Sequence, residues 1–260
     1  MSDDTHALAA LKRYFQFPFQ GPEWQQKFLI GAGLTILGYI IPIIPWIFLY
    51  GYFISIMRQT IQGDAPSLPV WADWNQLGKD GLRAFLIGFL FLLPANIVLF
   101  GGWFFYCMAS IILPLATSSD FYAAQDPSGW ILIFFMFSLI ILMLSIPIGM
   151  ILGFLGGIPL PVATANLISE DRLSGAFKIR LIWRVLRRNA LGYLIAWLLA
   201  FGIFSFFYLF SLITIYTIIF ACLVPIVLPA AAFYFGAVTS AIFGDAYREG
   251  MQEIQLEIAA

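Results

Sequence analysis

Four arginines at helical spacing carry the clearest chemistry in this sequence. A helix over this stretch places them on one face, since they follow the pattern i, i+4, i+7, i+8: Arg180, Arg184, Arg187 and Arg188. Apolar residues fill the other side: Phe177, Leu181, Ile182, Val185 and Leu186. Guanidinium groups match phosphate geometry, and a basic amphipathic helix suits anionic lipid headgroups. A compatible alternative is that these arginines only set the membrane topology.

Catalytic and metal-binding patterns are missing from the sequence. It has no Walker loop, GxSxG, HExxH or CxxC motif, and its single histidine, His6, lies in a polar stretch near the start. Cys107 and Cys222 lie within apolar runs, as small buried residues do. We therefore expect a protein that is not an enzyme, with no catalytic residues, no cofactor and no metal. No acidic or basic tail points to nucleic acid.

The composition is that of a membrane protein. Of the 260 residues, 62% are hydrophobic and 10% are charged, whereas soluble domains average roughly 45–50% apolar and about 25% charged residues. So much apolar surface needs a lipid bilayer as its solvent.

Uncharged blocks predict where the membrane spans lie. Four stretches contain no Asp, Glu, Lys or Arg: Phe28–Met57, Ala84–Ser119, Pro127–Ser169 and Asn189–Gly244. A span needs about 20 apolar residues, so the last block holds two spans. Pro42 and Pro45 divide the first block into short helices, from about Trp24 to Ile41 and from Trp46 to about Thr60. Further prolines predict kinks in the two middle blocks: Pro94, Pro114, Pro147, Pro159 and Pro161.

Basic residues predict the orientation. They gather before the first block, between the first and second, between the third and fourth, and after the fourth, whereas residues 117–129 have two aspartates and no basic residue. The positive-inside rule then places segments 1–23 and 245–260, and so both termini, in the cytoplasm, with 117–129 outside. Six spans in a single membrane domain, 1–260, satisfy this order. The alternative is eight spans, with both middle blocks folded as hairpins. Either way, we predict an all-α, polytopic transmembrane helix bundle in the cell membrane.

Two cytoplasmic connections, residues 63–83 and 170–188, are predicted as amphipathic interfacial helices. The first places Trp71, Trp74 and Leu77 on one side at helical spacing, and the second carries Trp183. Tryptophan favours the headgroup level, where its ring is apolar and its N–H stays hydrated. The three tryptophans are therefore predicted interfacial anchors.

Inside the apolar blocks, two features predict helix contacts or a ligand path. Gly149, Gly153 and Gly157 form two successive GxxxG steps, which allow close approach of another backbone within the monomer or, less favoured, in a partner. Asn96 and Asn166 are amides that need hydrogen-bond partners in lipid. They mark a candidate polar substrate track, although hydrogen bonding between helices is the simpler interpretation.

Similar segments recur along the chain and resemble a known family. "RLSGAFKIRLIWRVLRRNALGYLI" aligns with "LPVWADWNQLGKDGLRAF" and its neighbours, and "KFLIG" echoes "AFLIG". Two interpretations are open: three helical-hairpin repeats, or chance alignment of apolar segments. "FPFQGPEWQQKFLIGAGLTIL", "LPVWADWNQLGKDGL", "RRNALGYL" and "FGDAYREG" together resemble the domain-of-unknown-function 4013 membrane family of bacteria and archaea. The resemblance implies a polytopic membrane protein and no particular activity.

The function expected from these features is non-enzymatic. A membrane frame without catalytic groups favours a scaffold, an accessory subunit or a lipid-organising factor. Its partners would be membrane lipids with anionic headgroups, and a partner subunit or a second copy of the chain. The alternative is a transporter or exporter of an apolar or lipid-like substrate, motivated by the proline-broken helices and the two amides. Proton or ion coupling is not expected, because the blocks lack acidic and basic side chains.

The predicted topology is testable with single cysteines at Ser67 and Ser118, in a background without Cys107 and Cys222. An impermeant thiol reagent on intact cells should label position 118, which is predicted outside, and leave position 67 unlabelled. Labelling at 67 alone would overturn the orientation, and labelling at neither would support eight spans.

Overall fold

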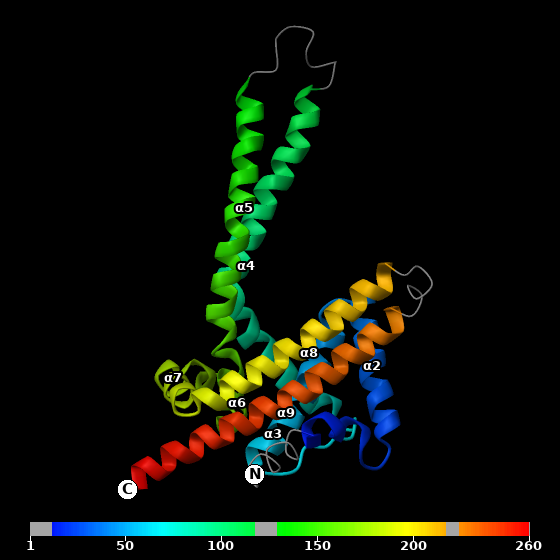
Figure 1. Ribbon diagram of the computed structural model, residues 1–260, viewed down its shortest axis with the longest axis vertical. Helices are drawn as coiled ribbons and strands as arrows, with labels where there is room; N and C mark the ends of the chain where they lie inside the picture. The colour runs from blue at the N-terminus through cyan, green and yellow to red at the C-terminus, as the bar shows by residue number, and fades with distance from the viewer. Residues whose placement is uncertain (1–11, 118–128, 217–223, 260) are drawn as a thin grey trace. The chain divides into compact units, whose positions relative to one another are not determined.

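Helices make up the regular structure of this chain. The computed structural model describes residues 12–117, 129–216 and 224–259 (Figure 1), and within these ranges it contains no strand. The predicted all-α class is confirmed. After a short helical turn at residues 12–16, the elements are η1 Phe17–Phe19, α2 Trp24–Ile40, α3 Ile44–Gln62, α4 Trp74–Thr117, α5 Gly129–Gly157, α6 Leu160–Glu170, η2 Leu173–Phe177, α7 Ile179–Arg188, α8 Ala190–Tyr216 and α9 Val224–Ala259.

Four helical stretches among the described residues are long and apolar enough to cross a membrane. They are Trp74–Leu115, Gly129–Glu170, Ala190–Thr214 and Val224–Ala259. Helices α2 and α3, of 17 and 19 residues, are about 26 and 29 Å long at 1.5 Å per residue. They are separated where Pro42 and Pro45 predicted a break. The count of six spans stays a prediction. The predicted outside loop lies mostly in 118–128, outside the described residues.

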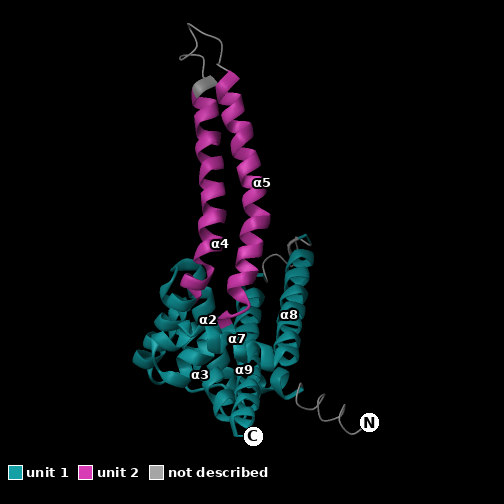
Figure 2. Cartoon of the chain, turned by 90° about the vertical axis from the view of Figure 1, so that its left-hand side faces the viewer, with its two compact units in different colours: residues 1–87, 161–260 teal, residues 88–160 magenta. Residues whose placement is uncertain are grey.

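The chain divides into two compact units (Figure 2). One contains residues 1–87 and 161–260, and the other contains residues 88–160. In the second unit, the later part of α4 packs along α5, and small residues allow close contact there. A Cβ added at Gly102 would overlap Ser145, and one added at Gly149 would overlap Leu99. Pro94 and Pro114 lie inside α4, and Pro147 lies inside α5.

Helix α9 organises the first unit, because it packs against α2, α3, α7, α8 and η1. Its buried face includes Phe233, Ala237, Val238 and Ala241. Glycines bring it close to its neighbours: a Cβ at Gly236 would overlap the Phe53 ring of α3. The same happens at Gly244 with Thr60 Oγ1, and a Cβ at Gly250 would lie 3.1 Å from Val185 Cγ1 of α7. Small residues at these positions allow helices to approach closely.

The N-terminal segment is attached to α9 by aromatic groups. Phe17 is buried, and the Tyr234 hydroxyl donates to Phe15 O at 3.0 Å. The Tyr14 hydroxyl donates to the Asp245 carboxylate, which also pairs with Arg248. Burial, followed by the hydrogen bond to Asp245 and the negative charge of that carboxylate, raises the pKa of Tyr14, so this hydroxyl keeps its proton at neutral pH.

The stretch between α3 and α4 corrects one sequence expectation. The helix predicted over residues 63–83 is wrong for 63–73, which are not helical, and α4 begins at Trp74. Pro66 and Pro69 lie in this segment and disfavour a helix through their missing N–H groups. Asp73 Oδ1 then accepts from the Gln76 N–H at 3.0 Å, as a residue that caps a helix N-terminus does.

The start of α4 crosses α3 with almost no side chains between the two backbones. A Cβ at Gly51 of α3 would overlap Leu77 O, and a Cβ at Gly81 of α4 would overlap Ile47 O. Backbone carbonyls cannot rotate away as side chains do. This crossing therefore requires glycine on both helices.

We predict that Gly81→Ala lowers the melting temperature of the detergent-solubilised protein. The added methyl meets a backbone carbonyl, and such overpacking costs about 1–3 kcal/mol. The matched control is Gly33→Ala in α2, where nothing lies within 4 Å of the new methyl. That change should be neutral or stabilising, by up to about 1 kcal/mol of helix propensity. Equal melting shifts for the two variants would contradict the close crossing.

Candidate functional site

Helix α7, part of the first unit, packs its apolar face against α9 and leaves the predicted basic face exposed. Ile182 and Val185 are buried, and Val185 lies beside Gly250 of α9. Asn189, directly after α7, donates from Nδ2 to Ala246 O at 2.9 Å and accepts the Gly192 N–H on Oδ1 at 3.0 Å. The helix is therefore attached to α9 and joined firmly to the start of α8.

The four arginines of α7 have different partners. Arg188 pairs with Glu257 of α9, and the Arg187 guanidinium lies over the Trp183 ring, 5.0 Å from its centroid. Arg180 and Arg184 are exposed and form no ion pair with any residue that the structure describes. Among the described residues, Arg188 alone of the four is thus paired with a carboxylate, Arg187 lies on an aromatic ring, and Arg180 and Arg184 have neither contact.

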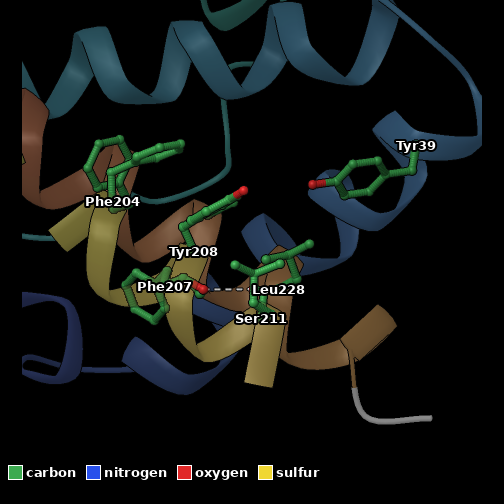
Figure 3. Close-up of a pocket in the computed structure, with 10 residues that line it drawn as sticks. Tyr39, Phe204, Phe207, Tyr208, Ser211 and Leu228 are labelled. Carbon is green, nitrogen blue, oxygen red and sulfur yellow. Dashed lines mark hydrogen bonds between the residues drawn. The ribbon is translucent and has the colours of Figure 1, made fainter. Parts of the chain in front are cut away.

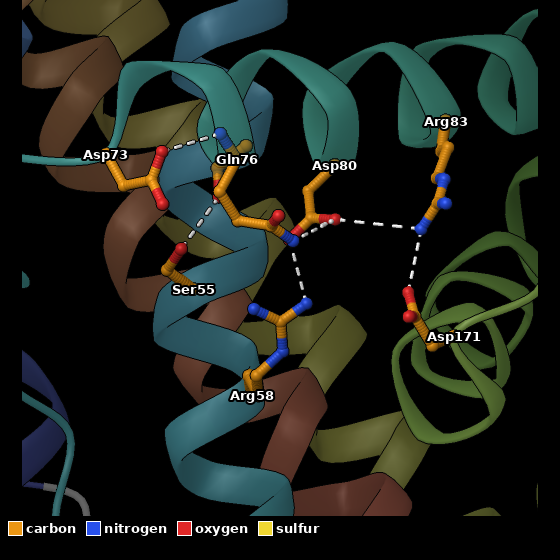
Figure 4. A network of polar contacts seen from close by, with 8 residues as sticks. Ser55, Arg58, Asp73, Gln76, Asp80, Arg83 and Asp171 are labelled. Carbon is orange, nitrogen blue, oxygen red and sulfur yellow. Dashed lines mark hydrogen bonds and ion pairs between the residues drawn. The ribbon is translucent and has the colours of Figure 1, made fainter.

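A network of charges connects α3, α4 and the turn after α6 (Figure 4). Asp80 is 3% exposed; its Oδ2 accepts from Arg58 at 2.8 Å, and both its oxygens lie 3.1 Å from Gln76 Nε2. Arg83 lies 3.9 Å from Asp80 and donates to Asp171 at 2.7 Å. The sequence by itself does not single out Asp80. The i,i+3 spacing of Asp80 and Arg83 is the sequence feature that could have predicted part of this network.

The three predicted tryptophan anchors lie in different surroundings. Trp71 is 8% exposed, stacks on Tyr52 with ring centroids 3.9 Å apart, and donates its Nε1–H to Lys27 O at 2.9 Å. It thus belongs to the core of its unit. Trp74 and Trp183 are 42% and 51% exposed, and they keep the exposure that an interfacial anchor needs.

The two amides of the predicted polar track lie in different units. Asn166, on α6, is fully buried. Its Oδ1 accepts from the Tyr247 hydroxyl of α9 at 2.7 Å, whereas its Nδ2 has no hydrogen-bond partner among the described residues. Asn96, on α4, is half-buried. The hydrogen bond between α6 and α9 is the kind expected of amides that join helices, and the track stays a prediction.

The GxxxG glycines of α5 have unequal surroundings. Gly149 meets Leu99 of α4, and a Cβ at Gly153 would lie 3.8 Å from the Ala95 Cβ, which is ordinary contact. Gly157 has nothing within 4 Å of a Cβ, whereas Gly156 lies against Phe91 O of α4. The closest approach thus involves Gly149 and Gly156, a spacing of seven residues, and Gly157 does not face α4. Helix α4 supplies the facing residues, which sequence spacing within α5 could not identify.

An apolar cavity opens between α2, α8 and α9 of the first unit (Figure 3). Its volume is about 470 Å³, and we call it the aromatic cavity after the rings among its lining residues: Tyr39, Phe204, Phe207, Tyr208, Ser211, Leu212, Leu228, Ala231, Ala232 and Phe235. Figure 3 shows the hydroxyls of Tyr39 and Tyr208 directed toward one another. Ser211 Oγ donates to Phe207 O at 2.7 Å. None of the described residues that line this cavity is charged.

Comparison with family models finds one that matches residues 34–216, described as "Protein of unknown function (DUF4013)". The chain belongs to the DUF4013 family. Comparison with curated proteins and with solved structures gives no match. The expected family membership is confirmed. The description of this family assigns it no activity.

The DUF4013 match covers the arginines of α7 and part of the lining of the aromatic cavity. It begins within α2 and ends with α8, so it includes the arginines of α7 and the α2 and α8 walls of the aromatic cavity. Helix α9, against which these elements pack, follows the matched range. Within the described residues, no three His, Cys, Asp or Glu side chains are grouped so that they could hold a metal ion.

We predict that Asp80→Asn destabilises the protein by about 1–3 kcal/mol. A fully buried pair would lose roughly 3–5 kcal/mol, but the Arg58 side chain is 32% exposed and water compensates part of the loss. The measurement is thermal unfolding in detergent, with the exposed Asp64→Asn as control. Arg58→Gln should cost less in the Asp80→Asn background than alone. Additive effects would show that the two side chains do not interact.

Proposed function

We propose that this DUF4013 protein is a non-enzymatic, lipid-organising membrane protein that binds anionic headgroups through α7. The observation that carries the proposal is the pair Arg180 and Arg184. Both lie one helical turn apart on an exposed face, and neither is neutralised by a carboxylate of the described chain. An anion from outside the chain would satisfy both charges.

Lipid phosphate suits this pair because of its charge and its place in the chain. Helix α7 leads within two residues into α8, whose first 25 residues form a candidate span. Arginine can lay its methylene stem along apolar surface and reach phosphate with its guanidinium. Exposed Trp183, on the same helix, suits the headgroup layer. In this arrangement α7 is an amphipathic interfacial helix on the cytoplasmic side, and both termini are cytoplasmic.

Because α7 is attached to the bundle, the proposal is of a defined binding site and not of nonspecific attraction to surface charge. Ile182, Val185 and Asn189 hold the helix against α9 and α8. Headgroups bound at Arg180 and Arg184 would therefore occupy defined positions around the bundle. This fits a scaffold that orders lipids, and each charge near an anionic surface contributes about 1 kcal/mol, screened by salt.

A second candidate is transport of an apolar or lipid-like molecule. The aromatic cavity favours it, because an uncharged space of about 470 Å³ between helices has the size of ordinary ligand sites. Transport in addition requires that a bound molecule leave on the opposite side. Exchange of a fluorescent lipid between the leaflets of proteoliposomes would distinguish this candidate, since lipid organisation predicts no acceleration over protein-free vesicles.

We predict that Arg180→Gln/Arg184→Gln lowers retention of phosphatidylglycerol roughly tenfold or more, because two contributions of about 1 kcal/mol are lost. Native mass spectrometry of protein from mixed phosphatidylglycerol and phosphatidylcholine measures this. The matched control is Arg187→Gln/Arg188→Gln, which removes the same charge from the same helix but from groups engaged with Trp183 and Glu257.

Each outcome of this comparison has one meaning. A larger loss in the first double variant supports a site at Arg180 and Arg184. Equal losses would mean that α7 attracts lipid only through its total charge, and no loss in either would reduce the arginines to topology signals. The thiol-labelling test must show in each variant that position 67 stays unlabelled and position 118 is labelled, because these residues contribute to the positive-inside signal.

A further inference from the structure

A second cavity adjoins the aromatic cavity along α9. It has a volume of about 380 Å³, and we call it the hydroxyl cavity after the alcohol side chains among its lining residues: Trp46, Tyr50, Phe53, Ile54, Met57, Ala84, Thr164, Ala232, Phe235, Gly236, Thr239 and Ser240. Ala232 and Phe235 line both cavities. The two spaces are therefore neighbours along one short stretch of α9.

The alcohol side chains of Thr239 and Ser240 offer hydrogen-bond acceptors in the hydroxyl cavity. Thr239 Oγ1 donates to Phe235 O at 2.7 Å, and Ser240 Oγ donates to Gly236 O at 2.7 Å. Each hydroxyl has one proton and two lone pairs, so these two oxygens keep lone pairs for a hydrogen bond from a ligand. A group that donates a hydrogen bond, such as an alcohol, matches them.

Neither cavity has a charged residue in its lining. A carboxylate or phosphate placed there would lose its hydration without a cation to replace it, which is costly. The aromatic cavity is lined almost wholly by carbon, so it suits a hydrocarbon chain. The lining thus selects a neutral molecule with an alcohol head and an apolar tail.

The dimensions fit one lipid chain. Ser240 in the hydroxyl cavity and Leu228 in the aromatic cavity are separated by about 18 Å along α9, at 1.5 Å per residue. Half of a hydrocarbon core of about 30 Å is about 15 Å. Tyr39, Phe204 and Tyr208 are 60%, 58% and 57% exposed, so the aromatic cavity is open at its side. Lipid can enter from the bilayer without passing through water.

We propose that the two cavities together bind one neutral lipid that carries a free hydroxyl group. Its hydroxyl donates to Thr239 or Ser240, and its chain passes Ala232 and Phe235 into the aromatic cavity. This site is separate from the arginines of α7, and the proposal does not depend on binding of anionic lipid there.

The test uses hexadecanol with a photoreactive diazirine in its chain, added to the full-length protein in phosphatidylcholine nanodiscs. Crosslinks are mapped by peptide mass spectrometry and should concentrate on residues 204–212 and 228–236. Two probes with the same chain serve as controls: the methyl ether, which cannot donate a hydrogen bond, and the fatty acid at pH 8. Both should label these peptides at least fivefold less than the alcohol does.

Two variants test the site itself. Ala232→Phe places a ring where the cavities meet and should reduce labelling at least fivefold, whereas Leu198→Phe, at a 62% exposed position of α8, should leave it unchanged. Thr239→Val/Ser240→Ala removes both accepting oxygens with little change of shape, and should reduce the preference for the alcohol over the ether. If Ala232→Phe does not fold, this double variant decides the matter alone.

Several results would overturn the proposal. Equal labelling by the alcohol and the ether would show that the hydroxyl cavity does not recognise the hydroxyl group of the lipid. Labelling that follows surface exposure, or that is equal in Ala232→Phe and Leu198→Phe, would mean that the probe only reports contact with bulk lipid. Stronger labelling by the fatty acid would show that the lining tolerates charge, against the chemistry argued here.

Discussion

Close approach of helix backbones is the constraint on which the first unit depends. Lipid is as apolar as the helices themselves, so association in a membrane relies on van der Waals contact and hydrogen bonds rather than on exclusion of water. The chain places glycine where its helices come closest: Gly51 and Gly81 between α3 and α4, and Gly236, Gly244 and Gly250 along α9. Larger residues at these points would separate the helices and weaken the contacts that hold α7 and the cavity walls.

Polar contacts then determine the positions of helices and connecting segments that close packing alone does not determine. Asp80 ties α4 to Arg58 of α3, and Arg83 extends the connection to Asp171. Trp71 is fixed both by its stack on Tyr52 and by its bond to Lys27 O. Unpaired polar groups are costly in a low dielectric, so each of these contacts selects one arrangement of the connecting segments. On α7, Arg188 is paired with Glu257 in the same way, whereas Arg180 and Arg184 are the residues of the proposed anionic-lipid site.

The proposed lipid sites differ in the chemistry that they recognise. The face of α7 offers guanidinium groups to phosphate, whereas the cavities beside α9 offer lone pairs and aromatic rings to a neutral molecule. Both depend on α9, which packs against α7 and supplies a wall of each cavity. A protein of this kind would sample the charge of the headgroup layer and the neutral lipid of the bilayer interior at separate places.

The sequence by itself determined the helical class, the long apolar stretches of α4, α8 and α9, and the break at Pro42 and Pro45, because these follow from composition and local periodicity. The family was indicated by the resemblance of several segments to DUF4013. Only the tertiary structure decided that Trp71 is buried, that Arg188 meets Glu257, and that α9 borders two cavities. The physical reason is that periodicity reports which face of a segment is apolar. It does not report which neighbour covers that face, and in lipid the exposed and buried faces have nearly the same composition.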